Sequence, residues 1–364
     1  MMEEFNNKVT PQAEQESTAT TPIYIPVKSA PLYYTPKVTD PDLLVKKEYK
    51  SAANRASSGL LLFYGCGMLF QIVIAVLAVI FLAKGNAEYN EFVSFISATT
   101  FNLLLNSFYQ CLFMTVPFII SAAISRQRAS DILSYKKPKG ILPLAILGLS
   151  GAMLCNLANS IISALFSLFG ASPQGGNIEM EYSVGSFFLN ILTIAVIPAL
   201  FEEFAFRGIF MGLLRKRFST SAAIIVSAAG FGLIHGNFAQ MPFAFLMGLI
   251  LGYLYAVSGS LWVPMLVHFL NNAYSVCLDH ITHGLDTTSS NVIFYASLCI
   301  LLLSGIITLI YIIKRKPQLL HYEDEEKELS TPKMLKIGFS SPVFIIAAVL
   351  FMLDAVIKQI VGVA

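Results

Sequence analysis

The sequence predicts an all-α fold: a polytopic bundle of about eight or nine transmembrane helices behind a disordered polar N-terminal tail. Three observations predict it. Hydrophobic residues make up 55% of the 364 residues and charged residues only 13%. Apolar runs recur at the length of roughly 20 residues that one bilayer crossing requires. A few ionisable side chains interrupt these runs, although such groups are costly within lipid. We therefore expect the lipid bilayer as a partner, and the net charge of +2 gives no indication of nucleic-acid binding.

The tail is expected over residues 1–55. Met1 to Tyr49 is polar, is rich in Pro and Thr, and has no leading apolar core. It therefore does not resemble a cleavable signal peptide. Its composition is typical of a disordered segment.

Nine apolar segments follow, in three groups. Residues 56–183 hold the first membrane helices, 184–280 a helical core with the chemistry described below, and 281–364 the C-terminal helices. Asp354 and Lys358 interrupt the last segment at a spacing of four, where they could pair on one helical face. The nine segments are Gly59–Leu82, Phe101–Ile124, Ile141–Phe169, Val184–Leu214, Thr220–Ala239, Pro242–Val257, Leu261–Leu278, Val292–Ile313 and Pro342–Ile360.

The basic residues predict the orientation in the cell membrane. Lys and Arg are enriched in cytoplasmic loops, and alternate loops of this chain carry them. The N-terminus is therefore expected in the cytoplasm, with a multi-pass topology. The basic clusters are Lys46, Lys47, Lys50 and Arg55; Arg126, Arg128, Lys136, Lys137 and Lys139; Arg215, Lys216 and Arg217; and Lys314, Arg315 and Lys316.

The fourth segment contains charged residues deep in an apolar stretch. Glu203 and Arg207 are four residues apart, so a salt bridge on one helical face would neutralise both. We interpret this pair as structural, because a neutralised pair is poor at proton transfer. Glu202 lies one residue earlier and therefore points away from the helical face of Glu203 and Arg207. It is free for another role, such as that of a general base.

Two further segments supply His235, and His268 with Asn272. His268 and Asn272 are four apart and share a helical face. Counting about 1.5 Å per residue places all these groups at compatible depths. Pro198 and Pro264 each come four residues before a key polar side chain, where each frees a backbone carbonyl. Four unpaired polar groups in lipid favour a functional site.

Small residues at a spacing of four suggest close helix packing. Gly208 with Gly212, and Gly248 with Gly252, would let neighbouring helices approach each other closely in the membrane. We interpret both pairs as packing residues rather than as part of a catalytic site.

The polar residues fall into three short motifs. Glu202–Arg207 fits EExxxR, Phe231–His235 fits FxxxH, and His268–Asn272 fits HxxxN. The three motifs, in this order on successive membrane segments, resemble the CAAX prenyl protease and bacteriocin-processing (CPBP or Abi) family of intramembrane endopeptidases. The resemblance covers roughly Val184 to Leu278.

The resemblance implies hydrolysis of a peptide bond within or at the edge of the membrane. Glu202 and His235 would activate water, His268 and Asn272 would donate hydrogen bonds to the oxyanion, and Glu203 with Arg207 would brace the fourth helix. The expected substrate is a membrane-proximal peptide or protein, such as a prenylated C terminus or a leader peptide.

A metal cofactor is left open. Glu202, His235 and His268 would form a zinc ligand set of the kind found in soluble proteases, and members of the family are widely described as metalloproteases. The HExxH spacing of such proteases is absent. A metal-free glutamate hydrolase and a zinc enzyme both fit these residues, with a slight preference for no tightly held metal.

Two other functions fit the same residues. Intramembrane Glu and His also mark proton-coupled transporters, although no inverted repeat is visible. A non-catalytic bacteriocin-immunity or scaffold protein is the second alternative, since the family resemblance permits it.

Overall fold

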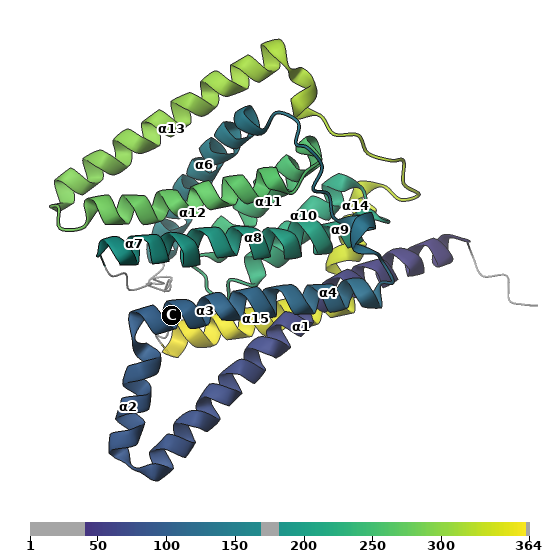
Figure 1. Cartoon of the computed structure of the whole chain (residues 1–364). Coiled ribbons are helices and arrows are strands. Elements are labelled where there is room, and N and C mark those ends of the chain that lie inside the picture. The colour runs from purple at the N-terminus through teal and green to yellow at the C-terminus, as the bar shows by residue number, and fades with distance from the viewer. Residues whose placement is uncertain (1–40, 169–181, 362–364) are drawn as a thin grey trace, which may run out of the picture. The chain divides into compact units, whose positions relative to one another are not determined.

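A computed structural model describes residues 41–168 and 182–361, which lie within one compact unit, Pro41–Ala364. Every regular element in these two ranges is helical, as Figure 1 shows. Seven of the described helices are long and apolar enough to cross a membrane. The predicted all-α membrane fold is confirmed. The expected number of eight or nine spans is larger than these seven, because the described helices in the segments Thr220–Ala239 and Leu261–Leu278 are not long and apolar enough to be counted.

The N-terminal part consists of apolar helices joined by short turns. Its elements are α1 (Pro41–Lys84), α2 (Asn86–Ser97), α3 (Thr99–Tyr109), the π-helix η1 (Gln110–Met114), α4 (Thr115–Ile124), α5 (Ala129–Ile132) and α6 (Ile141–Leu168). α3, η1 and α4 continue one another as a single membrane-length element. α1 packs against α4 and also against the C-terminal helix.

The middle of the chain holds the helices with the polar motifs. They are α7 (Val184–Asn190), the π-helix η2 (Ile191–Val196), α8 (Ile197–Glu203), the π-helix η3 (Phe204–Phe210), α9 (Met211–Arg215), α10 (Thr220–Leu233), α11 (Met241–Ser258) and α12 (Trp262–Thr282). α7 to α9 form one membrane-length element, and α12 packs against α8, η2 and α6.

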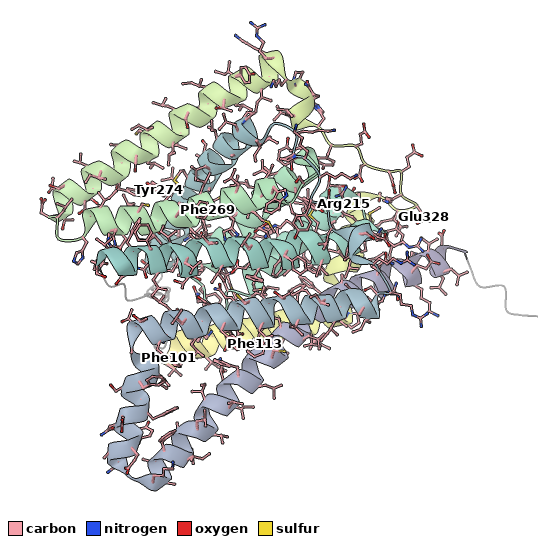
Figure 2. All side chains as sticks on the ribbon, in the orientation of Figure 1. Phe101, Phe113, Arg215, Phe269, Tyr274 and Glu328 are labelled. Atoms are coloured by element: carbon pink, nitrogen blue, oxygen red, sulfur yellow. The ribbon has the colours of Figure 1, made fainter. Side chains whose placement is uncertain are left out.

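The C-terminal part packs against the rest of the bundle in two places. Its elements are α13 (Thr287–Arg315), the short 3₁₀ helix η4 (Pro317–Leu320), α14 (Thr331–Phe339) and α15 (Pro342–Val361). α13 packs against α6, and α15 packs against α1. Tyr274 of α12, labelled in Figure 2, shares a hydrogen bond of 2.8 Å with the Ser297 hydroxyl of α13.

The first helix begins earlier than the sequence indicated. Residues 41–55 were expected in the disordered tail, but they form the start of α1. The reason is tertiary packing: Tyr49 is buried, with its ring 5.5 Å from that of Phe218. Glu48 also pairs with Arg217 at 2.9 Å. The rest of the expected tail, residues 1–40, lies outside the described residues.

The helix expected over Thr220–Ala239 is shorter than predicted. α10 ends at Leu233, and Gly236 has a φ of 60°. A left-handed residue cannot continue a helix, so residues 234–240 leave the helical path at membrane depth. His235 therefore sits on a turn instead of a helix.

Glycines allow the close helix contacts that the sequence predicted. A Cβ atom at Gly248 of α11 would lie 2.9 Å from the Ala228 Cα of α10, and one at Gly212 of α9 would lie 2.9 Å from the Ile132 carbonyl oxygen. Both distances are shorter than a carbon side chain tolerates. The predicted packing role of these glycines is confirmed.

The last helix contains the predicted ion pair. Lys358 Nζ lies 2.8 Å from Asp354 Oδ2, and both side chains are partly exposed. They flank a cavity of about 320 Å³ that is also lined by Tyr109 and Gly236. The pairing lets α15 carry two charges in an otherwise apolar segment.

Replacing Lys358 alone tests this account. Lys358→Met leaves Asp354 without its counter-ion, and we expect a loss of roughly 1–3 kcal/mol in the free energy of unfolding. The double variant Asp354→Asn/Lys358→Met should regain most of that loss. Thermal unfolding in detergent measures both, and equal melting temperatures for the wild type and Lys358→Met would contradict the prediction.

Candidate active site

The Glu203 carboxylate is the centre of the polar cluster. Its Oε1 atom accepts hydrogen bonds from Arg207 Nη1 at 2.9 Å and from His268 Nδ1 at 2.8 Å. Glu203 is fully buried, and Arg207 is only 1% exposed. The predicted ion pair of Glu203 and Arg207 is present. The contact with His268 was not predicted, because no local spacing relates α8 to α12.

Arg207 has two further neighbours that hold its charge in the protein interior. Its Nη2 atom donates to the Gly248 carbonyl at 3.4 Å, and its guanidinium carbon lies 4.3 Å from the centre of the Phe231 ring. An aromatic face attracts a cation. The Phe of the FxxxH motif thereby contacts the Arg of the EExxxR motif and links α10 to η3.

Glu202 faces the other nitrogen of the same imidazole. Its Oε2 atom lies 3.9 Å from His268 Nε2, and Glu202 is 8% exposed. This distance is too long for a direct hydrogen bond. A separation of this length fits two groups that each bind the same atom lying between them.

The contacts of the two histidines fix which ring nitrogen carries the proton. His268 Nδ1 faces a carboxylate oxygen, and His235 Nδ1 lies 2.8 Å from the Phe231 carbonyl oxygen. Both partners can only accept, so both Nδ1 atoms donate. In the neutral form, each Nε2 atom then keeps a lone pair. The Phe231 ring lies between the two imidazoles, with its centre 5.0 Å from that of His235 and 6.1 Å from that of His268.

Asn272 connects the site to the π-helix η2, which contains Ile194. Its Nδ2 atom donates to the Ile194 carbonyl at 3.0 Å, and its Oδ1 atom accepts from Asn271 at 3.1 Å. Pro198 has no N–H for the Ile194 carbonyl four residues before it. The sequence predicted this freed carbonyl, and the structure gives it the Asn272 amide as a partner.

Two π-helices flank the residues of the site. η2 comes directly before α8, and η3 directly follows Glu203 and contains Arg207. Such wide turns are rare and occur frequently at functional sites. No sequence pattern indicated them.

The geometry of the described residues gives no support for the expected metal-ligand set. In the described ranges, no group of three or more His, Cys, Asp or Glu side chains is arranged to hold a metal ion. The ligand set Glu202, His235 and His268 is therefore not supported, and we derive no catalytic step from zinc or another metal.

Comparison with known proteins points to one family. Residues 184–274 match the model of the type II CAAX prenyl endopeptidase Rce1-like family. The predicted family resemblance is confirmed. The matched segment contains all six polar residues of the three motifs: Glu202, Glu203, Arg207, His235, His268 and Asn272.

Two curated proteins resemble the chain. It is 30% identical over 152 residues to "Membrane-embedded CAAX protease MroQ" of Staphylococcus aureus, covering 40% of this chain and 61% of that protein. It is 24% identical over 143 residues to "Putative membrane peptidase YdiL" of Bacillus subtilis, covering 38% and 59%. The chain thus spans about three fifths of the length of these relatives. No solved structure gives a significant match.

Glu203→Gln tests the central role of this carboxylate. The amide nitrogen can replace Oε2, which is buried without a hydrogen-bond partner among the described residues. The shape is kept, but Arg207 loses its counter-ion, and we expect a loss of about 3–5 kcal/mol in the free energy of unfolding. Glu202→Gln should cost less than about 1 kcal/mol, because Glu202 has no ion-pair partner within direct bonding distance. Chemical unfolding in detergent compares the two, and equal losses would contradict the assignment.

Proposed function

We propose that this protein is a membrane endopeptidase that hydrolyses a peptide bond with water held between Glu202 and His268. The observation that carries the proposal is the 3.9 Å separation of Glu202 Oε2 and His268 Nε2, with the opposite side of the imidazole fixed on Glu203. The match of residues 184–274 to a family of CAAX prenyl endopeptidases supports the same reaction.

A water molecule fits the space between the two groups. An oxygen atom can lie at about 2.8 Å from both Glu202 Oε2 and His268 Nε2, which is hydrogen-bond distance. Both groups are acceptors, so the water would give one hydrogen to each. The lone pairs on its oxygen are then free to attack a carbonyl carbon.

Glu202 is the general base in this mechanism. It takes a proton as the water oxygen bonds to the carbonyl carbon of the peptide, and a tetrahedral oxyanion forms. The same proton then passes to the amide nitrogen, the carbon–nitrogen bond breaks, and an acid and an amine are released. The carboxylate is thus regenerated at the end of each cycle.

Asn272 is the proposed donor to the oxyanion. One hydrogen of its amide is used by the Ile194 carbonyl, which fixes the plane of the group, and the second hydrogen remains. The contacts of His268 favour a role in holding water over the donor role that the sequence suggested. An imidazole whose Nδ1–H is bound to Glu203 can donate from Nε2 only as an imidazolium.

The remaining residues position this machinery. Glu203 orients His268, and Arg207 pairs with Glu203 in the protein interior. His235 offers a second unprotonated ring nitrogen near Glu202, which would hold the water or the substrate amide. The proposed substrate is a membrane-proximal peptide, either a lipid-modified C terminus or a leader peptide, and the proposed orientation places the N-terminus in the cytoplasm.

The first test is Glu202→Gln. We expect peptide release from membranes to fall by about two to four powers of ten, because the general base is lost while the protein still inserts and folds. Mass spectrometry of peptides released from membranes that carry the wild type or the variant measures this. Glu91→Gln, the same change at an exposed position on α2, is the matched control. Unchanged release by Glu202→Gln would remove the proposed base.

The same assay with a chelator tests the metal question. Hydrolysis by Glu202-activated water predicts that release continues after removal of divalent metals. Loss of activity that returns on adding zinc would contradict the metal-free mechanism and would leave the peptidase assignment intact.

Asn272→Ala tests the oxyanion donor. Removing one such donor typically costs about two to three powers of ten in kcat. The free energy of unfolding should change by only about 1–2 kcal/mol, because the Ile194 carbonyl loses the Asn272 amide as its donor. Steady-state kinetics on a peptide identified in the release assay provides the measurement. A change confined to KM would argue against a role in the transition state.

A further inference from the structure

A second cavity is lined by residues of α8 that do not include its two carboxylates. It has a volume of about 340 Å³ and is lined mainly by apolar side chains from α8, η3 and α12. We call it the α8 groove and define it by Leu200, Phe201, Phe204, Trp262 and Met265, with Thr115 and Tyr135 completing the lining.

The α8 groove is separate from the proposed active site. Glu202 and Glu203 point into the protein, where they are 8% and 0% exposed. Leu200 is 39% exposed and therefore lies on the outer surface of the same helix. In a membrane-spanning element, this surface faces lipid.

Two aromatic rings mark one end of the groove. Tyr135 and Trp262 pack edge to face, with ring centres 5.5 Å apart, and both are partly exposed. Tyr and Trp are enriched where the hydrocarbon meets the headgroups. This end of the α8 groove therefore lies at the level of the membrane surface.

The loop beside these rings is held in place at both ends. Ser134 Oγ donates to the Gly259 carbonyl at 2.6 Å, and the Ser134 carbonyl accepts from the Leu261 amide at 2.8 Å. The Lys139 amide donates to the Ser258 carbonyl at 3.4 Å. The segment between Ser134 and Lys139 is thus fixed against the turn that joins α11 to α12.

This fixed loop carries three lysines next to the groove. Lys136, Lys137 and Lys139 are exposed and lie within four residues after Tyr135 in the chain. Within the two described ranges, no acidic side chain forms an ion pair with any of them. A ligand for this surface needs an apolar part for the groove and a negative charge at its end.

We propose that the α8 groove binds an anionic phospholipid, with an acyl chain along α8 and the headgroup phosphate at Lys136 and Lys137. A peptide segment fits less well, because an extended backbone in lipid must satisfy every N–H and C=O group. Among the lining side chains, only Thr115 and Tyr135 carry hydroxyls, and the Thr115 hydroxyl oxygen is buried. An acyl chain has no such requirement, and surface lysines attract anionic headgroups.

The single tryptophan of the chain provides a direct probe, because Trp262 lines the groove. The purified full chain in nanodiscs is titrated with phosphatidylglycerol or phosphatidylcholine that carries bromine on the acyl chains. We expect phosphatidylglycerol to quench Trp262 fluorescence at a mole fraction about 25-fold lower, since Lys136 and Lys137 each contribute about fivefold. Equal quenching by the two lipids would overturn the proposal.

Two variants separate headgroup recognition from general lipid contact. Lys136→Gln/Lys137→Gln should reduce the preference for phosphatidylglycerol by about fivefold for each lysine removed. The control Lys333→Gln/Lys336→Gln removes the same charge from exposed positions on α14 and should keep the preference. An unchanged preference in the first variant, or an equal loss in the control, would overturn the proposal.

A third variant tests where the acyl chain lies. Thr115→Phe narrows the α8 groove without adding a tryptophan, so quenching by both brominated lipids should weaken. The melting temperature shows whether the Thr115→Phe protein is folded. The lysine variants change exposed positions and test the proposal without relying on Thr115→Phe. Undiminished quenching in folded Thr115→Phe protein would place the chain outside the groove and overturn the proposal.

Discussion

The site depends on one buried carboxylate oxygen that serves two helices. Glu203 Oε1 neutralises the Arg207 guanidinium and also fixes His268 of α12. A cation without a partner within the membrane would be costly, so this contact stabilises the fold. The same contact turns the other nitrogen of His268 towards Glu202. Stability and the proposed chemistry therefore depend on a single interaction.

The two adjacent glutamates have different tasks because of where they lie on the helix. Glu203 has two charged or polar partners at direct hydrogen-bond distance, whereas Glu202 meets His268 only across a gap of 3.9 Å. A carboxylate that is held by a cation is a poor proton acceptor. The one that faces a gap is available to take a proton from water. This difference supports Glu202 as the base and Glu203 as a positioning residue.

Local spacing predicted much of this arrangement. The pairs Glu203–Arg207 and Asp354–Lys358 follow from a separation of four residues on a helix, and Pro198 indicated the free carbonyl that Asn272 binds. Local spacing does not predict contacts between segments that are far apart in the sequence. The bond from Glu203 to His268 depends on how α8 packs against α12, and the early start of α1 depends on the burial of Tyr49.

The end of α10 shows the same limit. The apolar run continues to Ala239, so hydropathy alone extends the helix, but the left-handed Gly236 turns the chain away. His235 consequently reaches the site from a turn. Irregular backbone at membrane depth is tolerated where it is covered by protein or lines a wet cavity, and Gly236 does line a cavity with Asp354 and Lys358.

The protonation of His268 tests the central claim most directly. Nitrogen-15 NMR of protein labelled at histidine, with His268→Gln used for assignment, distinguishes the two ring nitrogens. The account predicts that Nδ1 carries the proton, which binds Glu203, and that Nε2 keeps a lone pair. A proton on Nε2 with Nδ1 bare, or a fully protonated ring, would contradict it.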